Sequence, residues 1–132
     1  MSSEVQFVAR ITKSKVKAVA EGVTKQLTLE LGRQASEVKN SDSAFWIEEL
    51  GTVSSFLVWR VWEEDSLWIV LAWTQPSSRC RGNYRKLFDH LKAHAKKSGF
   101  VRILCGIAPE NALSREVHMG MGMKPVMFEV QA

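Results

Sequence analysis

Residues 74–84 read TQPSSRCRGNY and separate an apolar run, SLWIVLAW (66–73), from a run with helical spacing of its apolar residues, RKLFDHLKAHAKK (85–97). The apolar run predicts a central strand that is buried on both faces. A loop that leads from such a strand into a helix presents backbone N–H groups and the positive end of the helix dipole, which together bind phosphate. We therefore predict an anion-binding loop at this junction.

The side chains of the loop support this prediction. Arg79, Arg81 and Arg85 add positive charge at the same place, and Gly82 lets the backbone approach a ligand closely. Cys80 lies within the loop. The alternative is an ordinary polar loop whose arginines are solvated, because a motif this short is weak evidence by itself.

The rest of the chain predicts a single α/β domain over residues 1–132 with a mixed central sheet. The element order is β-α-β-β-β-α-β-α-β, with antiparallel hairpins first and a βαβ unit after them. Strands are expected at residues 5–11, 44–50, 53–62, 66–74, 100–108 and 124–130, and helices at residues 14–31, 83–97 and 110–119.

Composition limits the function classes. The chain has 132 residues, a formal net charge of +4 and two cysteines. Two cysteines form no disulfide framework, which favours a reducing, cytoplasmic location. We find no secretory signal and no apolar run of about 18 residues, so no membrane span is expected. The positive charge favours an anionic partner without choosing between nucleic acid, a phosphorylated cofactor and an acidic protein.

Two segments of the chain resemble signatures of the GNAT family of N-acetyltransferases. The first is similar to V-x-P-x-x-R/Q-x-x-G-x-G/A, and the second, NALSREVHMGMGM (111–123), to N-x-x-A-x-x-x-Y-x-K-x-G-F. The resemblance covers about residues 66–130, the expected cofactor-binding half, while over residues 1–65 only the order of elements agrees. The matching positions are Thr74, Pro76, Arg79, Gly82 and Tyr84 in the first signature, and Asn111, Ser114, His118, Gly120, Gly122 and Met123 in the second.

The resemblance implies acetyl-CoA as the acetyl donor. Backbone N–H groups of residues 79–84 would hold its pyrophosphate, and its pantetheine arm would pair with the strand near residues 72–74. A backbone N–H there would stabilise the developing oxyanion while a neutral amine, on a small molecule or a protein, attacks directly. The cofactor-binding residues expected are Ala72, Trp73, Thr74, Arg79, Cys80, Arg81, Gly82, Asn83, Tyr84, Asn111 and Arg115.

The helix at residues 110–119 carries the candidate catalytic residues. Asn111, Arg115 and His118 are spaced to share one helical face, which would look toward the cofactor thiol. His118 stands where the family commonly has Tyr, and we assign it as the general acid, since histidine changes charge near neutral pH. The alternative is a surface histidine that makes no catalytic contact. No metal site is expected.

The general base is assigned to Glu110. Glu48 or Glu49, on an earlier strand, are alternatives, and some family members use water. Glu110 also fits the plainer role of an acidic residue that stabilises a helix N-terminus.

The sequence departs from the family pattern at three places. Tyr84 replaces a Gly or Ala, where it would either crowd the pyrophosphate or point outward; His118 replaces Tyr; and the family's usual seventh strand is expected to be missing. Either a partner subunit in a homodimer completes the sheet, or the substrate brings its own contacts. These departures keep open a catalytically inert GNAT-fold binding or regulatory protein. A nucleic-acid binder that uses exposed tryptophans is a third class, which we do not favour.

Overall fold

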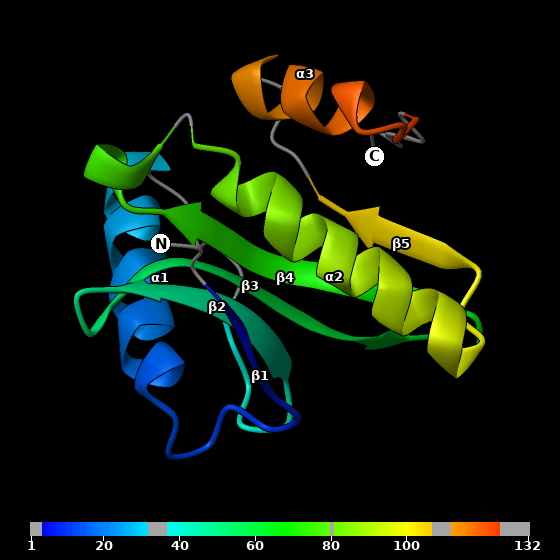
Figure 1. The fold of residues 1–132 in the computed structure, drawn as a ribbon, viewed down its shortest axis with the longest axis horizontal. Coiled ribbons are helices and arrows are strands. Elements are labelled where there is room, and N and C mark those ends of the chain that lie inside the picture. The colour runs from blue at the N-terminus through cyan, green and yellow to red at the C-terminus, as the bar shows by residue number, and fades with distance from the viewer. Residues whose placement is uncertain (1–3, 32–36, 80, 107–111, 125–132) are drawn as a thin grey trace, which may run out of the picture.

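The computed structural model describes residues 4–31, 37–79, 81–106 and 112–124. A five-stranded sheet has the order β1-β2-β3-β4-β5, in which the first three pairs are antiparallel and β4–β5 is parallel (Figure 1). This confirms the mixed α/β sheet. The elements are β1 (Val5–Val8), α1 (Lys15–Leu31), β2 (Ser43–Glu49), β3 (Thr52–Trp62), β4 (Ser66–Thr74), a 3-10 turn (Pro76–Ser78), α2 (Asn83–Ser98), β5 (Arg102–Cys105) and α3 (Ala112–Gly120).

Two predicted strands are shorter than expected. β1 ends at Val8 because Ile11 leaves the sheet and packs, fully buried, in the core beneath α1. β5 begins only at Arg102, where the parallel ladder starts at the pair Ser66–Arg102; the amides of Val101 and Arg102 both donate to the Asp65 carbonyl in the β3–β4 turn. The predicted last strand, residues 124–130, lies almost wholly outside the described residues.

One helix covers each face of the sheet. α1 packs through buried Val16, Ala20 and Val23 against one face. α2 packs through Leu87, Phe88, Leu91 and Ala95 against the other face. The spacing of these residues follows the helical repeat, as the sequence predicts. No helix in the described ranges is both long enough and apolar enough to cross a membrane.

A β-bulge and the end of a strand ladder coincide in the middle of β4. The β3–β4 register passes from Trp59–Ile69 to Val58–Leu71, so Val70 is the extra residue of the bulge. The parallel ladder with β5 ends at the same point, at the pair Ile69–Cys105. β4 continues to Thr74, paired with β3 along one edge only within the described residues. Beyond Ile69, β4 runs on with no described strand along the edge that β5 occupied, and we call the space beside this edge the open fork.

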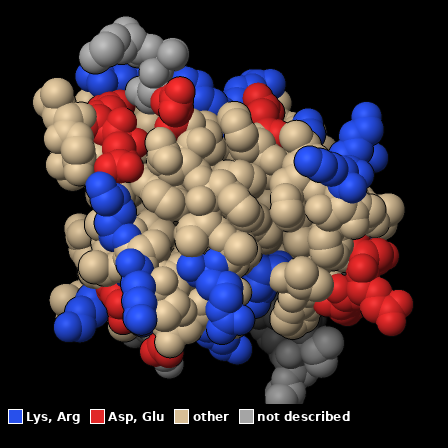
Figure 2. Space-filling model, turned by 60° about the horizontal axis from the view of Figure 1, so that its bottom comes forward, with Lys and Arg blue, Asp and Glu red and all other residues tan. Residues whose placement is uncertain are grey.

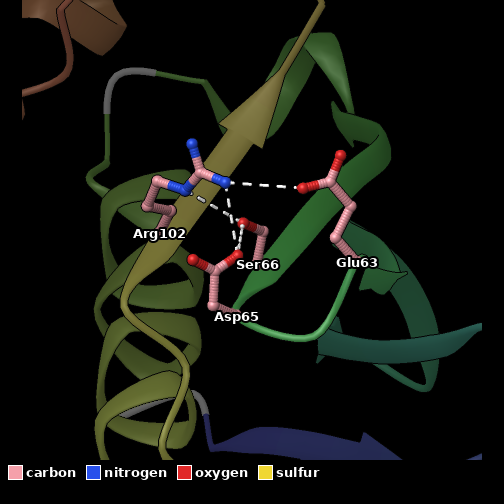
Figure 3. A network of polar contacts seen from close by, with 4 residues as sticks. All are labelled: Glu63, Asp65, Ser66 and Arg102. Carbon is pink, nitrogen blue, oxygen red and sulfur yellow. Dashed lines mark hydrogen bonds and ion pairs between the residues drawn. The ribbon is translucent and has the colours of Figure 1, made fainter.

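The opposite end of this ladder is closed by polar contacts (Figure 3). The Arg102 guanidinium donates to Asp65 Oδ1 at 3.2 Å and to Ser66 Oγ at 3.1 Å, and it lies 3.6 Å from Glu63 Oε2. The hydrogen bond from Ser66, followed by that from Arg102, holds the pKa of the Asp65 carboxyl below its usual value. We name these four residues the β5 clasp. It ties the start of β5 to the β3–β4 turn and so fixes where the fork opens.

Candidate functional site

The loop before α2 has the geometry expected of an anion site. Gly82 precedes the helix in the left-handed conformation (φ 75°), and no described side chain caps the helix start. The amides of the first helical turn have no acceptor within the helix, and they lie at the positive end of its dipole. A Cβ atom built on Gly82 meets no described atom within 4 Å, so space for a ligand lies directly beside this backbone.

An internal carboxylate already lies against this loop. Glu49, the last residue of β2, accepts from Ser78 Oγ at 2.9 Å and from Asn83 Nδ2 at 3.4 Å. Its Oε2 lies 3.6 Å from Arg81 Nη1. Sequence reasoning missed this contact, because Glu49 is more than 25 residues away from the loop and no local pattern links them. Ser78, Asn83 and Arg81 of the loop therefore all contact one negatively charged group.

The three arginines of the loop do not all point at one place. Arg79 folds back and donates from Nε to the Thr74 carbonyl at 3.1 Å. Arg81 pairs with Glu49, and Arg85 is exposed on the first turn of α2. Cys80, predicted to bind the cofactor, lies outside the described residues. The positive charges of Arg79, Arg81 and Arg85 are therefore divided between the end of β4, Glu49 and solvent.

The predicted pantetheine strand lies along the open fork. Ala72 faces the core under α2, and Trp73 faces the core under α1. Thr74 Oγ1 lies 2.8 Å from Ser55 Oγ on β3, which anchors the end of β4. β3 occupies one edge of residues 70–74, and among the described residues no strand pairs with the other edge, which can therefore pair with an extended ligand.

Tyr84 points neither outward nor at the anion loop. Its hydroxyl lies 2.7 Å from Nε2 of His118 on α3, and the two rings meet edge to face. His118 Nδ1 lies 2.6 Å from the Ser114 carbonyl oxygen, which can only accept. His118 is buried, and each of its ring nitrogens has a hydrogen-bond partner. His118 is therefore not at the surface, where the alternative interpretation placed it, while its catalytic role stays a prediction; the sequence could not show that Tyr84 is its partner.

The predicted shared face of α3 is divided between two environments. Arg115 is exposed while His118 is buried. Both nevertheless line a cleft of about 1730 Å³ between α2, β5 and α3, together with Cys105 at the end of β5. Figure 1 shows α3 beyond the carboxyl end of β5. Asn111 and Glu110, the other predicted residues of this helix end, lie outside the described residues.

The two alternative bases are in different environments. Glu48 is paired with Lys15 and accepts from Trp46 Nε1, and these contacts lower the pKa of its carboxyl. It is therefore committed to α1, away from the cofactor loop. Glu49 lies at the anion loop, as described above.

The tryptophans do not form an exposed row. Trp46 and Trp59 are buried, Trp68 and Trp73 pack partly buried in the core under α1, and only Trp62 is half-exposed. On the face seen in Figure 2, acidic and basic side chains are mixed around an uncharged centre. Neither feature supplies the basic, aromatic surface that a nucleic-acid binder uses.

The comparison with known protein families agrees with this geometry. Residues 17–123 match the family model described as "Acetyltransferase (GNAT) family". The chain belongs to this acetyltransferase family. Membership confirms the resemblance of the two signatures and identifies a GNAT acetyltransferase that uses acetyl-CoA as its acetyl donor.

Solved structures share the fold of this GNAT domain over nearly their whole length. A possible acetyltransferase from Clostridium difficile 630 superposes with a TM-score of 0.72 at 14% identity, covering 100% of this chain and 99% of that chain. A ribosomal-protein-alanine N-acetyltransferase from Brucella melitensis biovar Abortus 2308 gives 0.73 at 10% identity, with 99% and 98% covered. An aminoglycoside N-acetyltransferase in complex with CoA gives 0.65 at 18% identity, with 98% and 99% covered.

No curated protein matches the sequence of this GNAT domain significantly. The solved structures are also too distant in sequence to transfer an acceptor, since all three are under 20% identical. The acceptor must therefore be argued from the site itself.

Proposed function

We propose that this acetyltransferase moves the acetyl group of acetyl-CoA to a primary amine by direct attack. The observation that carries the proposal is the open fork, which begins at Ile69–Cys105 and extends along β4 toward the loop that contains Gly82. The pyrophosphate would bind the amides and side chains of residues 79–84, and the pantetheine arm would pair with the free edge of residues 72–74. The acetyl carbonyl would then accept a backbone hydrogen bond as its oxygen becomes negative.

The proton-transfer groups are proposed to lie at the far end of the same site. Glu110 is the proposed base, with a water molecule as the alternative. Arg115 and Asn111 are proposed to line the cofactor side of α3 with His118. Both ring nitrogens of His118 have hydrogen-bond partners, so an acid role for His118 has to act through one of these partners.

The acceptor class is tested with a panel of amines. The solved neighbours include a ribosomal-protein-alanine and an aminoglycoside N-acetyltransferase. We therefore propose kanamycin, spermidine and a peptide with an alanine N-terminus as first acceptors. Acetyl-CoA binding is measured by calorimetry, and free thiol release is measured with each amine. Saturable binding together with amine-dependent thiol release is expected. Absence of acetyl-CoA binding at millimolar concentration would contradict the proposal.

A catalytically inert binding or regulatory protein is the second candidate. The observation that favours it is the Tyr84–His118 hydrogen bond, which occupies the ring nitrogen that a general-acid histidine would use. This candidate predicts acetyl-CoA binding with no thiol release for any amine in a broad panel. A homodimer that completes the sheet stays a prediction, and analytical ultracentrifugation tests it.

A further inference from the structure

Tyr84 and His118 are both departures from the family pattern, and in the structure they touch. We propose that the Tyr84 hydroxyl, with His118 behind it, protonates the sulfur of the departing coenzyme A thiolate. The proposal rests on the proposed function. In this proposal Tyr84, on α2, is the residue that contacts the sulfur. His118, on α3, does not contact the sulfur and acts through Tyr84.

The first argument is the orientation of the histidine ring. The Ser114 carbonyl can only accept, so His118 Nδ1 carries a proton and donates it at 2.6 Å. Nε2 is then the nitrogen that can exchange a proton, and the Tyr84 oxygen lies 2.7 Å from it. His118 as a whole is 9% exposed. Among the described residues, the Tyr84 hydroxyl is therefore the hydrogen-bond partner through which Nε2 can pass a proton.

The second argument is where this hydroxyl lies. Tyr84 packs against the same core as Ala72 and Cys105, on the α2 side of the sheet. Burial raises the pKa of its hydroxyl, and the Cys105 thiol raises it further. Cys105 forms the last pair of the parallel ladder with Ile69. The hydroxyl therefore lies on the α2 side of the fork, where the thioester end of the proposed pantetheine arm would be.

The third argument is the chemistry of the pair. Burial disfavours a tyrosinate, so Tyr84 alone would be a poor acid at neutral pH. In the proposed pair, Nε2–H of His118 returns a proton to the tyrosine oxygen as that oxygen gives one up. The buried tyrosine then never needs to hold a full negative charge.

The step balances as follows. The amine nitrogen forms a bond to the acetyl carbon, and the C–S bond breaks with its electron pair left on sulfur. Sulfur takes the proton of the Tyr84 hydroxyl, and the tyrosine oxygen takes the Nε2 proton of His118. The ammonium formed by attack releases one proton to the base and solvent, which returns a proton to His118 for the next turnover.

The direct test is Tyr84→Phe, which removes only the hydroxyl. With whichever amine of the panel the wild type acetylates, kcat should fall about 100-fold, a typical contribution of general acid catalysis. The Kd for acetyl-CoA should stay within about threefold, because the loop amides are unchanged. The matched control is His90→Gln, a substitution of an exposed histidine on α2 that should leave kcat unchanged. A kcat for Tyr84→Phe within twofold of wild type would overturn the proposal.

A double variant tests whether the two departures act as a pair. Tyr84→Ala together with His118→Tyr gives both positions the residue types of the family pattern. The pair should have a kcat at least tenfold above that of Tyr84→Ala alone, because the hydroxyl is then supplied from α3. If the double variant is no faster than either single variant, the two positions are not coupled and the proposal fails.

A readout without turnover separates this proposal from the proposed function. The imidazole nitrogens of 15N-labelled protein are followed by NMR while CoA or desulfo-CoA is added. CoA should shift the His118 Nε2 resonance more than desulfo-CoA does, and Tyr84→Phe should abolish this difference. Equal shifts from both ligands would overturn the placement of the hydroxyl at the sulfur. A wild type that shows the predicted shifts but acetylates no amine would instead refute only the proposed function.

Discussion

The carboxylate of Glu49, at the end of β2, accepts a 2.9 Å hydrogen bond from the Ser78 hydroxyl in the turn before α2. This contact places a negative charge beside the loop that is proposed to bind a diphosphate. The Ser78 and Asn83 side-chain donors of the loop are thus satisfied in the free protein by a side chain of the same chain. Cofactor binding must either displace this carboxylate or tolerate a like charge nearby, and both cost free energy.

Glu49→Gln should therefore tighten cofactor binding. The amide can still accept from Ser78, but the repulsion with the diphosphate is removed. We expect the Kd for acetyl-CoA to fall about fivefold at low salt and less at 0.5 M NaCl, where charges are screened. Calorimetry at the two salt concentrations measures this.

The control is Glu48→Gln on the neighbouring position. It removes the same formal charge, but Glu48 is paired with Lys15 on the α1 side. Its effect on the Kd should be small. A weaker affinity in Glu49→Gln than in wild type would mean that Glu49 positions the loop and does not oppose the ligand.

Gly82→Glu should abolish cofactor binding. The new side chain would enter the open space beside the loop and add a carboxylate where the diphosphate is proposed to lie. We expect the Kd for acetyl-CoA to rise at least about 100-fold. Calorimetry with acetyl-CoA provides the measurement, and an unchanged Kd would refute the placement of the loop.

Gly99→Glu is a matched control for backbone strain. Gly99 ends α2 in nearly the same left-handed conformation (φ 83°), also with open space around it. Both substitutions should lower the melting temperature by a similar amount, since each puts a non-glycine residue at positive φ. Only Gly82→Glu should lose the cofactor.

Cys105 should react slowly with alkylating agents, and bound CoA should slow it further. Burial raises the pKa of its thiol, so less thiolate is present at a given pH than in a free cysteine. In a Cys80→Ala background, iodoacetamide labelling should reach its half-maximal rate above about pH 8.5. An exposed control cysteine, from Ser98→Cys, should label faster and be indifferent to CoA. Labelling of Cys105 that CoA does not slow would argue against the fork as the cofactor channel.

Asp65→Asn should weaken the β5 clasp in a pH-dependent way. The pKa of Asp65 is lowered in the folded protein, so its contribution to stability is present above the usual aspartate pKa of about 3.9 and is lost as pH falls through the lower folded value. Because the clasp is exposed, we expect a melting temperature lower by only about 2 °C at pH 7 and a vanishing difference near pH 2. Asp89→Asn, on the exposed face of α2, is the control in thermal scans. A difference that persists at pH 2 would contradict the assignment.

The order of elements and the anion loop could be predicted from sequence because both rest on local signals. The β4 run is apolar almost throughout, α2 has a helical apolar stripe, and Gly82 and Gly99 mark its two ends. These features need no knowledge of distant residues. The boundaries of β1 and β5 were less predictable, because Ile11 and Val101 are apolar residues that the tertiary structure uses outside the sheet.

The contacts that give the site its character depend on residues far apart in the chain. Glu49 reaches Ser78 across two strand ends, and Tyr84 reaches His118 from another helix. The bulge at Val70 also leaves no signal in the sequence. Val70 and Leu71 are both apolar, so the pattern looks the same whichever face of the sheet each side chain occupies. A sequence pattern therefore showed which residues depart from the family, but only the fold shows that two of them meet.

The length of the open fork sets a requirement on the donor molecule. β4 runs about 13 Å from Val70 to Thr74 at the usual rise of a strand, and the anion loop follows its end in the chain. If the thioester of the donor is held at the bulge, a diphosphate of the same molecule can bind at Gly82 only when a long, extended linker joins the two groups. Truncated acetyl thioesters that lack the nucleotide should thus bind weakly however reactive they are, so that this dimension of the sheet acts as a molecular ruler for the donor.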